Sequence, residues 1–136
     1  MLALHHGANS VCSIKVRIVL AEKNLDWESR HIDLPKGEQF SPSYLAINPR
    51  AIVPVLDHDG LIINESTVIC EYLDSLSETN PLQPKSVYEK AKTHIWGIYT
   101  LEYHDSVNTL TFGSYQRQML LEKTPEELEA RWAAMP

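Results

Sequence analysis

Residues 64–67, Asn-Glu-Ser-Thr, carry side chains that could bind a charged ligand. They directly precede an apolar pattern with helical spacing, so they should form the first turn of a helix. Such a turn has unpaired backbone N–H groups and the positive end of the helix dipole, which attract a carboxylate or phosphate. Glu65 beside Ser66 could pair with an ammonium group, and the two receptors together suit the α-amino-acid end of a ligand. The simpler interpretation is that Asn64 or Ser66 only caps the helix.

A strand, a tight turn and a second strand should hold this helix start in place. Residues 53–56, Val-Pro-Val-Leu, are apolar and mostly β-branched, which favours a strand. Because proline cannot donate to a β-ladder, Pro54 should lie at the first position of that strand or on an edge. The Asp-Gly pair at 59–60 predicts a hairpin turn, followed by a strand over residues 61–63. The helix should then bury one face, made of Val68, Ile69, Tyr72, Leu73 and Leu76.

The chain before the hairpin completes an α/β domain. Three elements come first: a strand at residues 2–5, a helix at 11–23 and a strand at 27–33. Ser41-Pro42 then starts a short helix, with a capping serine before proline at the first helical position. The resulting order, βαβ-α-ββα, is that of a thioredoxin-like domain, which we place at residues 1–77.

The second half of the chain should be the start of an all-α helical domain. Residues 78–85 contain two prolines without apolar periodicity and should form a linker, and residues 86–136 a partial helical domain. A helix from residue 86 should fray or end within 108–114, which is rich in Thr and Gly. Thr124 begins a capping box that should start another helix. Two helices cannot cover all their apolar surface, so we expect further helices outside this chain or a covering partner.

Composition excludes several classes of function. The net charge of −6 and the lack of a basic cluster argue against a nucleic-acid partner. No apolar run reaches membrane-spanning length, and the start of the chain lacks the features of a secretory signal. Cys12 and Cys70 do not make a disulfide framework, so a cytoplasmic, reduced chain is the expectation. The six histidines show no metal-ligand spacing.

The run Asn-Pro-x-x-x-Val-Pro-Val-Leu, a hairpin, and Glu-Ser-x-x-Ile-x-x-Tyr-Leu resembles the glutathione-binding domain of the glutathione S-transferase family. The resemblance implies a cis peptide bond at Pro54, with the backbone of Val53 pairing with the cysteinyl part of glutathione. It implies that Glu65 and Ser66 hold the γ-glutamyl end, and that Gln39 contacts the glycyl end. Lys36 and Arg50 are nearby cations that could attract the glycyl carboxylate; the alternative is that both are solvated charges.

The run Ser-Val-Cys-Ser-Ile-Lys-Val-Arg at residues 10–17 resembles the first helix start of zeta-like and related bacterial members. The family places a Ser, Cys or Tyr here to hydrogen-bond the glutathione sulfur, which favours the thiolate. Ser10 is the first candidate, Cys12 the second and Ser13 the third. Ser10 could instead, or in addition, be an N-cap, and Cys12 a small buried helix residue. Residues 10–17 contain no second thiol near Cys12, which argues against dithiol exchange but leaves a monothiol role for Cys12.

The family's long helix lines the pocket for the electrophile, so Tyr103 and His104 are candidate pocket residues. The alternative is that they make core or dimer contacts. The resemblance is to bacterial transferases that cleave β-aryl ethers, which implies a small aromatic electrophile and a homodimer. Two alternatives stay open: a glutathione-dependent dehalogenase or isomerase, and a non-catalytic binding or assembly module of the same fold.

Overall fold

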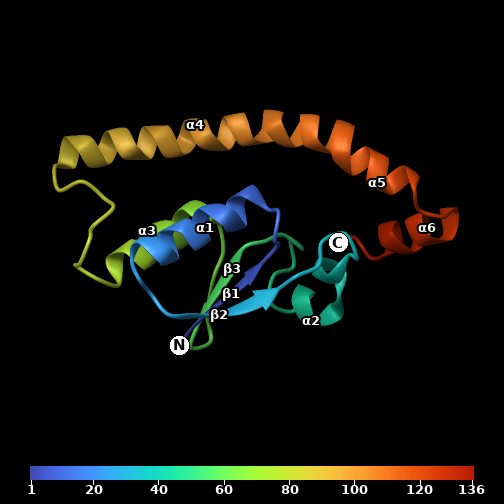
Figure 1. Ribbon diagram of the computed structural model, residues 1–136, viewed down its shortest axis with the longest axis horizontal. Helices are drawn as coiled ribbons and strands as arrows, with labels where there is room; N and C mark the ends of the chain where they lie inside the picture. The colour runs from blue at the N-terminus through green and yellow to red at the C-terminus, as the bar shows by residue number, and fades with distance from the viewer. The chain divides into compact units, whose positions relative to one another are not determined.

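The computed structural model describes residues 1–136, which divide into two units, Met1–Leu82 with Met135–Pro136, and Gln83–Ala134. The first unit is built on one mixed sheet with the strand order β2-β1-β3-β4 (Figure 1). The pair β1–β2 is parallel, and the other two pairs are antiparallel. The strands are β1 (Leu2–His6), β2 (Trp27–His31), β3 (Val55–His58) and β4 (Leu61–Ile63).

Three helices and one 3-10 turn complete the first unit. They are α1 (Val11–Glu22), η1 (Glu38–Phe40), α2 (Pro42–Leu45) and α3 (Ser66–Ser75). The predicted order βαβ-α-ββα and the thioredoxin-like fold are therefore confirmed. The predicted cap of α2 is also confirmed, because Ser41 Oγ accepts a hydrogen bond of 3.3 Å from the Tyr44 N–H and Pro42 takes the first helical position.

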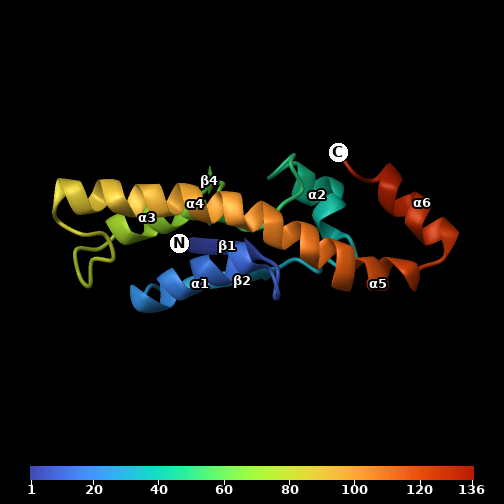
Figure 2. The same cartoon turned by 90° about the horizontal axis from the view of Figure 1, so that it is seen from above.

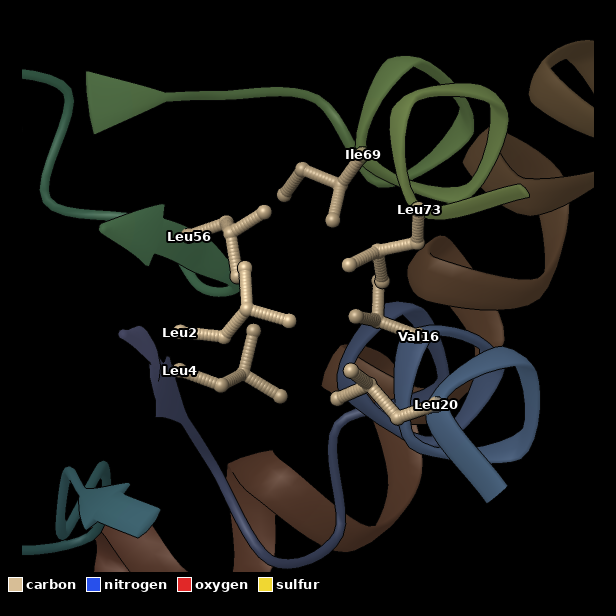
Figure 3. Packing of buried hydrophobic residues seen from close by; sticks show 7 residues of the cluster. All are labelled: Leu2, Leu4, Val16, Leu20, Leu56, Ile69 and Leu73. Carbon is tan, nitrogen blue, oxygen red and sulfur yellow. The ribbon is translucent and has the colours of Figure 1, made fainter. Parts of the chain in front are cut away.

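The core of the first unit lies between the sheet and the pair of helices α1 and α3. Figure 3 shows side chains of β1 and β3 meeting those of the two helices. The fully enclosed cluster consists of Leu2, Leu4, Val16, Leu20, Leu56, Ile69 and Leu73. Each such side chain contributes about 1.5–3 kcal/mol through burial, so this cluster stabilises the frame on which the candidate site rests.

Two local predictions near the hairpin are wrong in detail. Strand β3 starts at Val55, one residue after the first position that was expected for Pro54, because Pro54 has no N–H to offer the ladder. The buried stripe of α3 runs through Ser66, Ile69 and Leu73, whereas Val68 is 50% exposed. The stripe is rotated because α3 contacts α1 as well as β3.

A buried ion pair joins the end of α1 to the end of α3. Lys23 Nζ lies 2.9 Å from Asp74 Oδ1, and their side chains are 0% and 9% exposed. The same ammonium donates to the carbonyl oxygens of Ser77, Thr79 and Asn80 at 2.8–3.2 Å. Lys23 therefore fixes the segment that leaves α3.

Each of two adjacent histidines of β1 lies beside an arginine, which disfavours its protonated form. Arg17 Nη1 donates to His6 Nδ1 at 3.1 Å, which leaves the ring proton on Nε2, where it bonds Ser29 Oγ at 2.8 Å. Burial, with Arg17 as a further cause, lowers the pKa of His6 below its usual 6.5. Burial and Arg30 lower the pKa of His5 in the same way.

The folded state should therefore lose stability as the pH falls below about 6.5. Below this value the unfolded chain binds protons that folded His5 and His6 resist, so the free energy of unfolding decreases toward the folded pKa values. Above about pH 6.5 the contribution of the two histidines to the free energy of unfolding is fully present. Urea unfolding between pH 7.5 and 5 checks the slope, and a His5→Gln/His6→Gln variant should flatten it. The assignment of this pH dependence to His5 and His6 would be contradicted if the double variant kept the wild-type slope of unfolding free energy against pH and His94→Gln changed that slope.

The second unit is helical throughout. Its elements are α4 (Val87–Thr111), the π-helical turn η2 (Phe112–Gln116), α5 (Arg117–Leu121) and α6 (Pro125–Ala133). The α-helix α4 ends at Thr111, within the predicted range 108–114, but Figure 2 shows the helical chain running on through η2 into α5. The hydroxyls of Thr109, Thr111 and Ser114 donate to carbonyls four residues earlier, so they do not compete with the helix. The capping box at Thr124 is confirmed.

Candidate functional site

The start of α3 lacks the side-chain cap that most of the other long helices have. Its N-cap is Glu65, and no side-chain cap bond is made there, so the interpretation of Asn64 or Ser66 as a simple cap is wrong. The first helical bond is Ile69 N–H to Glu65 O at 2.9 Å. The N–H groups of Ser66, Thr67 and Val68 consequently have no partner in the chain.

Glu65 has an unusual backbone conformation for its residue type. Its φ of +68° lies in the left-handed region, which side chains other than Gly, Asn and Asp rarely adopt. Such conformations persist where surrounding structure holds them, and they are concentrated at binding and catalytic sites. Ser66 follows immediately and is 8% exposed, with no hydrogen bond from its hydroxyl. A strained turn thus presents a serine hydroxyl and three free N–H groups together.

The segment before β3 supplies a second set of unpaired polar groups. The peptide bond between Val53 and Pro54 is cis, the geometry that the resemblance implies. Val53 lies outside the sheet, and neither its N–H nor its C=O is hydrogen-bonded within the chain. An unpaired N–H and C=O on one residue can pair with a peptide group of a ligand, as neighbouring strands do.

An ion pair joins these two segments. Arg50, which precedes Val53, pairs with the carboxylate of Glu65, and both side chains are largely exposed. The pair brings the cis-proline segment beside the start of α3. Arg50 is therefore not a free cation, and Lys36 pairs with Asp33 at 3.0 Å. Hydrogen bonding to Lys36 lowers the pKa of Asp33.

Gln39 in η1 carries the one buried side-chain polar atom without a partner. The residue is 7% exposed, and its Oε1 has no hydrogen-bond partner. Leaving a buried amide oxygen unpaired costs about 1–3 kcal/mol. A ligand that donates to this amide would recover that energy, so Gln39 is a better binding candidate than its neighbours in the loop.

The structure separates the three candidates at the start of α1. Ser10 is half-buried and caps the helix, with Oγ accepting from the Ser13 N–H at 3.3 Å, so its hydroxyl proton stays available for donation. Ser13 is fully buried, and its Oγ accepts from the Gly7 N–H at 3.3 Å. Cys12 is half-buried. Burial raises the pKa of the other cysteine, Cys70, to about 11, which fits a structural thiol.

Tyr103 and His104 belong to the second unit. Both lie on α4, which has no buried residue. Tyr103 is 67% exposed, while His104 is half-buried and its Nδ1 lies 3.2 Å from Asn108 Nδ2. Both side chains are accessible enough to contact another molecule.

Two other findings concern metal binding and membrane-spanning helices. No group of three or more His, Cys, Asp or Glu side chains is arranged to hold a metal ion. No helix has both the length and the apolar character needed to cross a membrane.

Taken together, the first unit offers receptors for the parts of a small peptide. The start of α3 suits a carboxylate, Glu65 an ammonium group, and Val53 a peptide group. Sequence reasoning gave no role to Tyr44 and Asn48, which contact the segment before Val53. Only the position of Asn48 ahead of Pro49, a residue type common in turns, could have drawn attention to it.

Comparison with known proteins identifies the family of this chain. Residues 9–76 match the family model described as the N-terminal domain of glutathione S-transferase. The protein LigF of Sphingobium sp. (strain NBRC 103272 / SYK-6) is 41% identical over 99 residues, which cover 71% of this chain and 37% of LigF. Maleylacetoacetate isomerase of Dictyostelium discoideum is 44% identical over 84 residues, covering 60% of this chain and 38% of that protein.

Solved structures give the same result. The crystal structure of the β-etherase LigF matches with a TM-score of 0.88 and 33% identity, covering 95% of this chain and 54% of that one. A glutathione transferase homologue from Sulfitobacter with bound glutathione matches with a TM-score of 0.73 and 26% identity, covering 98% of this chain and 62% of that one. The chain spans between 37% and 42% of the length of the curated relatives it matches.

Proposed function

The chain belongs to the glutathione S-transferase family, and we propose that its first unit binds glutathione as the co-substrate of a transfer reaction. The observation that carries this proposal is the uncapped start of α3, where a buried serine and three unpaired N–H groups follow a left-handed Glu65. This arrangement favours an anion, and an isolated structural helix would gain from a cap instead.

Each part of glutathione has a receptor under this proposal. The γ-glutamyl carboxylate binds Ser66 and the N–H groups of α3, and its ammonium binds Glu65 in competition with Arg50. The cysteinyl peptide groups pair with Val53 beside Pro54. The N–H of the glycyl residue donates to the unpaired Oε1 of Gln39.

The proposed reaction is nucleophilic attack by the glutathione thiolate on a small electrophile, with Ser10 donating a hydrogen bond to the sulfur. Cys12 and Ser13 are the other candidates for this role, and Tyr103 and His104 for the electrophile pocket. The similarity to LigF favours an aromatic ether as electrophile, in which the thiolate forms a C–S bond and a phenolate leaves. The similarity to maleylacetoacetate isomerase favours a glutathione-dependent isomerase as the second candidate.

A cytoplasmic location and a homodimer form part of the same proposal. The apolar side chains of α4 that are more than half exposed, Trp96, Leu101 and Leu110 among them, support a protein partner for this helix. A non-catalytic module of the same fold is the remaining alternative. It would differ by losing affinity for glutathione.

Ser66→Ala should weaken glutathione binding about tenfold or more, because the variant removes a hydroxyl bonded to a charged group. Titration calorimetry on the full chain measures the dissociation constant. Ser75→Ala is the matched control, since Ser75 lies at the other end of α3 and its hydroxyl bonds only the Tyr72 carbonyl. Folded wild-type protein that gives no binding heat at millimolar glutathione would refute the proposed function for this chain.

A further inference from the structure

The carbonyl oxygen of Ile52 receives two buried side-chain donors. Tyr44 Oη, from α2, donates at 2.7 Å, and Asn48 Nδ2 donates at 2.9 Å. The two residues are only 3% and 2% exposed. Ile52 directly precedes Val53, so both donors act on the peptide unit that joins these two residues.

Asn48 also organises the turn that leads to Ile52. Its Oδ1 accepts from the Arg50 N–H at 3.1 Å, and its carbonyl accepts from the Ala51 N–H at 3.0 Å. Ala51 has a φ of +54°, a left-handed conformation that needs support from its surroundings. One buried amide therefore supports both ends of the segment between α2 and Val53.

The two hydrogen bonds to the Ile52 carbonyl give Tyr44 and Asn48 a role beyond filling the core. A leucine or phenylalanine could occupy the same volume, but it would leave the Ile52 carbonyl unpaired. Two donors on one carbonyl fix the plane of the peptide unit, and this plane sets the direction of the Val53 N–H. Val53 itself has no partner in the sheet, so the two hydrogen bonds to the preceding carbonyl hold the peptide unit that carries its N–H.

We infer that Tyr44 and Asn48 are positioning residues, which hold the Val53 backbone in the orientation that binds the cysteinyl part of glutathione. The inference rests on the proposed function and adds residues that do not touch the ligand. Preorganisation of this kind lowers the entropy lost on binding, so its removal weakens affinity without removing a ligand contact.

Tyr44→Phe tests the inference because it removes one donor and keeps the ring. We expect about fivefold weaker glutathione binding by calorimetry. Asn48→Asp, which keeps the acceptor for Arg50 and loses the donor, should weaken binding about tenfold or more. Tyr72→Phe is the matched control, since it removes a hydroxyl bonded at 2.7 Å to His58 Nδ1 in the same unit.

The amide resonance of Val53 in ¹⁵N-labelled protein supplies a signal that a purely structural role would not move. It should shift on adding glutathione to wild type and Tyr72→Phe, and shift less in Tyr44→Phe. Equal affinity and equal Val53 shifts in Tyr44→Phe and Tyr72→Phe would overturn the inference while the proposed function stands. Wild type that binds glutathione without any Val53 shift would also overturn it. No binding by wild type would overturn both.

Discussion

Replacing Lys23 with methionine should lower the free energy of unfolding by about 3–5 kcal/mol. The ammonium of Lys23 is enclosed, and it bonds the Asp74 carboxylate and three carbonyl oxygens beyond α3. Methionine has a similar length but no donor, so all four oxygens lose this partner. Asp74 then keeps a buried charge with the Leu82 N–H at 2.9 Å as one remaining donor. Urea unfolding followed by circular dichroism measures the loss.

A surface pair provides the control for this prediction. Lys92 lies 3.2 Å from Glu89 on α4, with both side chains about half exposed, and such pairs contribute at most about 1 kcal/mol. Lys92→Met should therefore change stability far less than Lys23→Met. If the two variants lose similar amounts, the carbonyl oxygens near Lys23 are reached by water and the pair is not enclosed in solution.

The parts of the fold that depend on neighbouring residues could be predicted from the sequence. Ser41-Pro42 and Thr124 start helices through bonds to residues three positions away, and the Asp-Gly turn closes the hairpin locally. The buried side of α3 and the partner of Lys23 depend on distant contacts instead. The buried side of α3 is set by α1, which is separated from it by β2, α2, β3 and β4 along the chain, and the pair of Lys23 with Asp74 spans 51 residues.

The residues of the candidate site also divide into those that the sequence could predict and those that only the structure shows. Glu65 and Ser66 could be proposed from their place at a helix start, but only the structure shows that α3 has no side-chain cap. The roles of Tyr44 and Asn48 could not be predicted, because a tyrosine in a short helix and an asparagine before proline have ordinary local explanations. Both side chains donate to the Ile52 carbonyl, and only the folded chain brings the two donors to this one acceptor.

Ser10→Ala should raise the pKa of the thiol of bound glutathione by about 1 to 2, because a hydrogen bond to a charged acceptor contributes about 1.5–3 kcal/mol. The thiolate fraction at neutral pH, and with it the rate of attack, should fall about 10- to 100-fold. Ser10 is the favoured donor because its Oγ accepts from the Ser13 N–H and keeps its proton, while the Ser13 hydroxyl is enclosed beside Gly7. Thiolate absorbance during a pH titration of the complex measures the pKa.

The loss of a helix cap must be separated from the loss of a sulfur partner. Ser10→Ala removes a cap worth about 1 kcal/mol, and Ser41→Ala removes a cap of the same 3.3 Å length from α2. Both variants should lose similar stability, but only Ser10→Ala should move the thiol pKa. If Cys12→Ala or Ser13→Ala moves it instead while Ser10→Ala does not, Ser10 is only a cap and the sulfur partner lies one turn further along α1. The comparison therefore assigns the thiol partner whichever of the three residues it is.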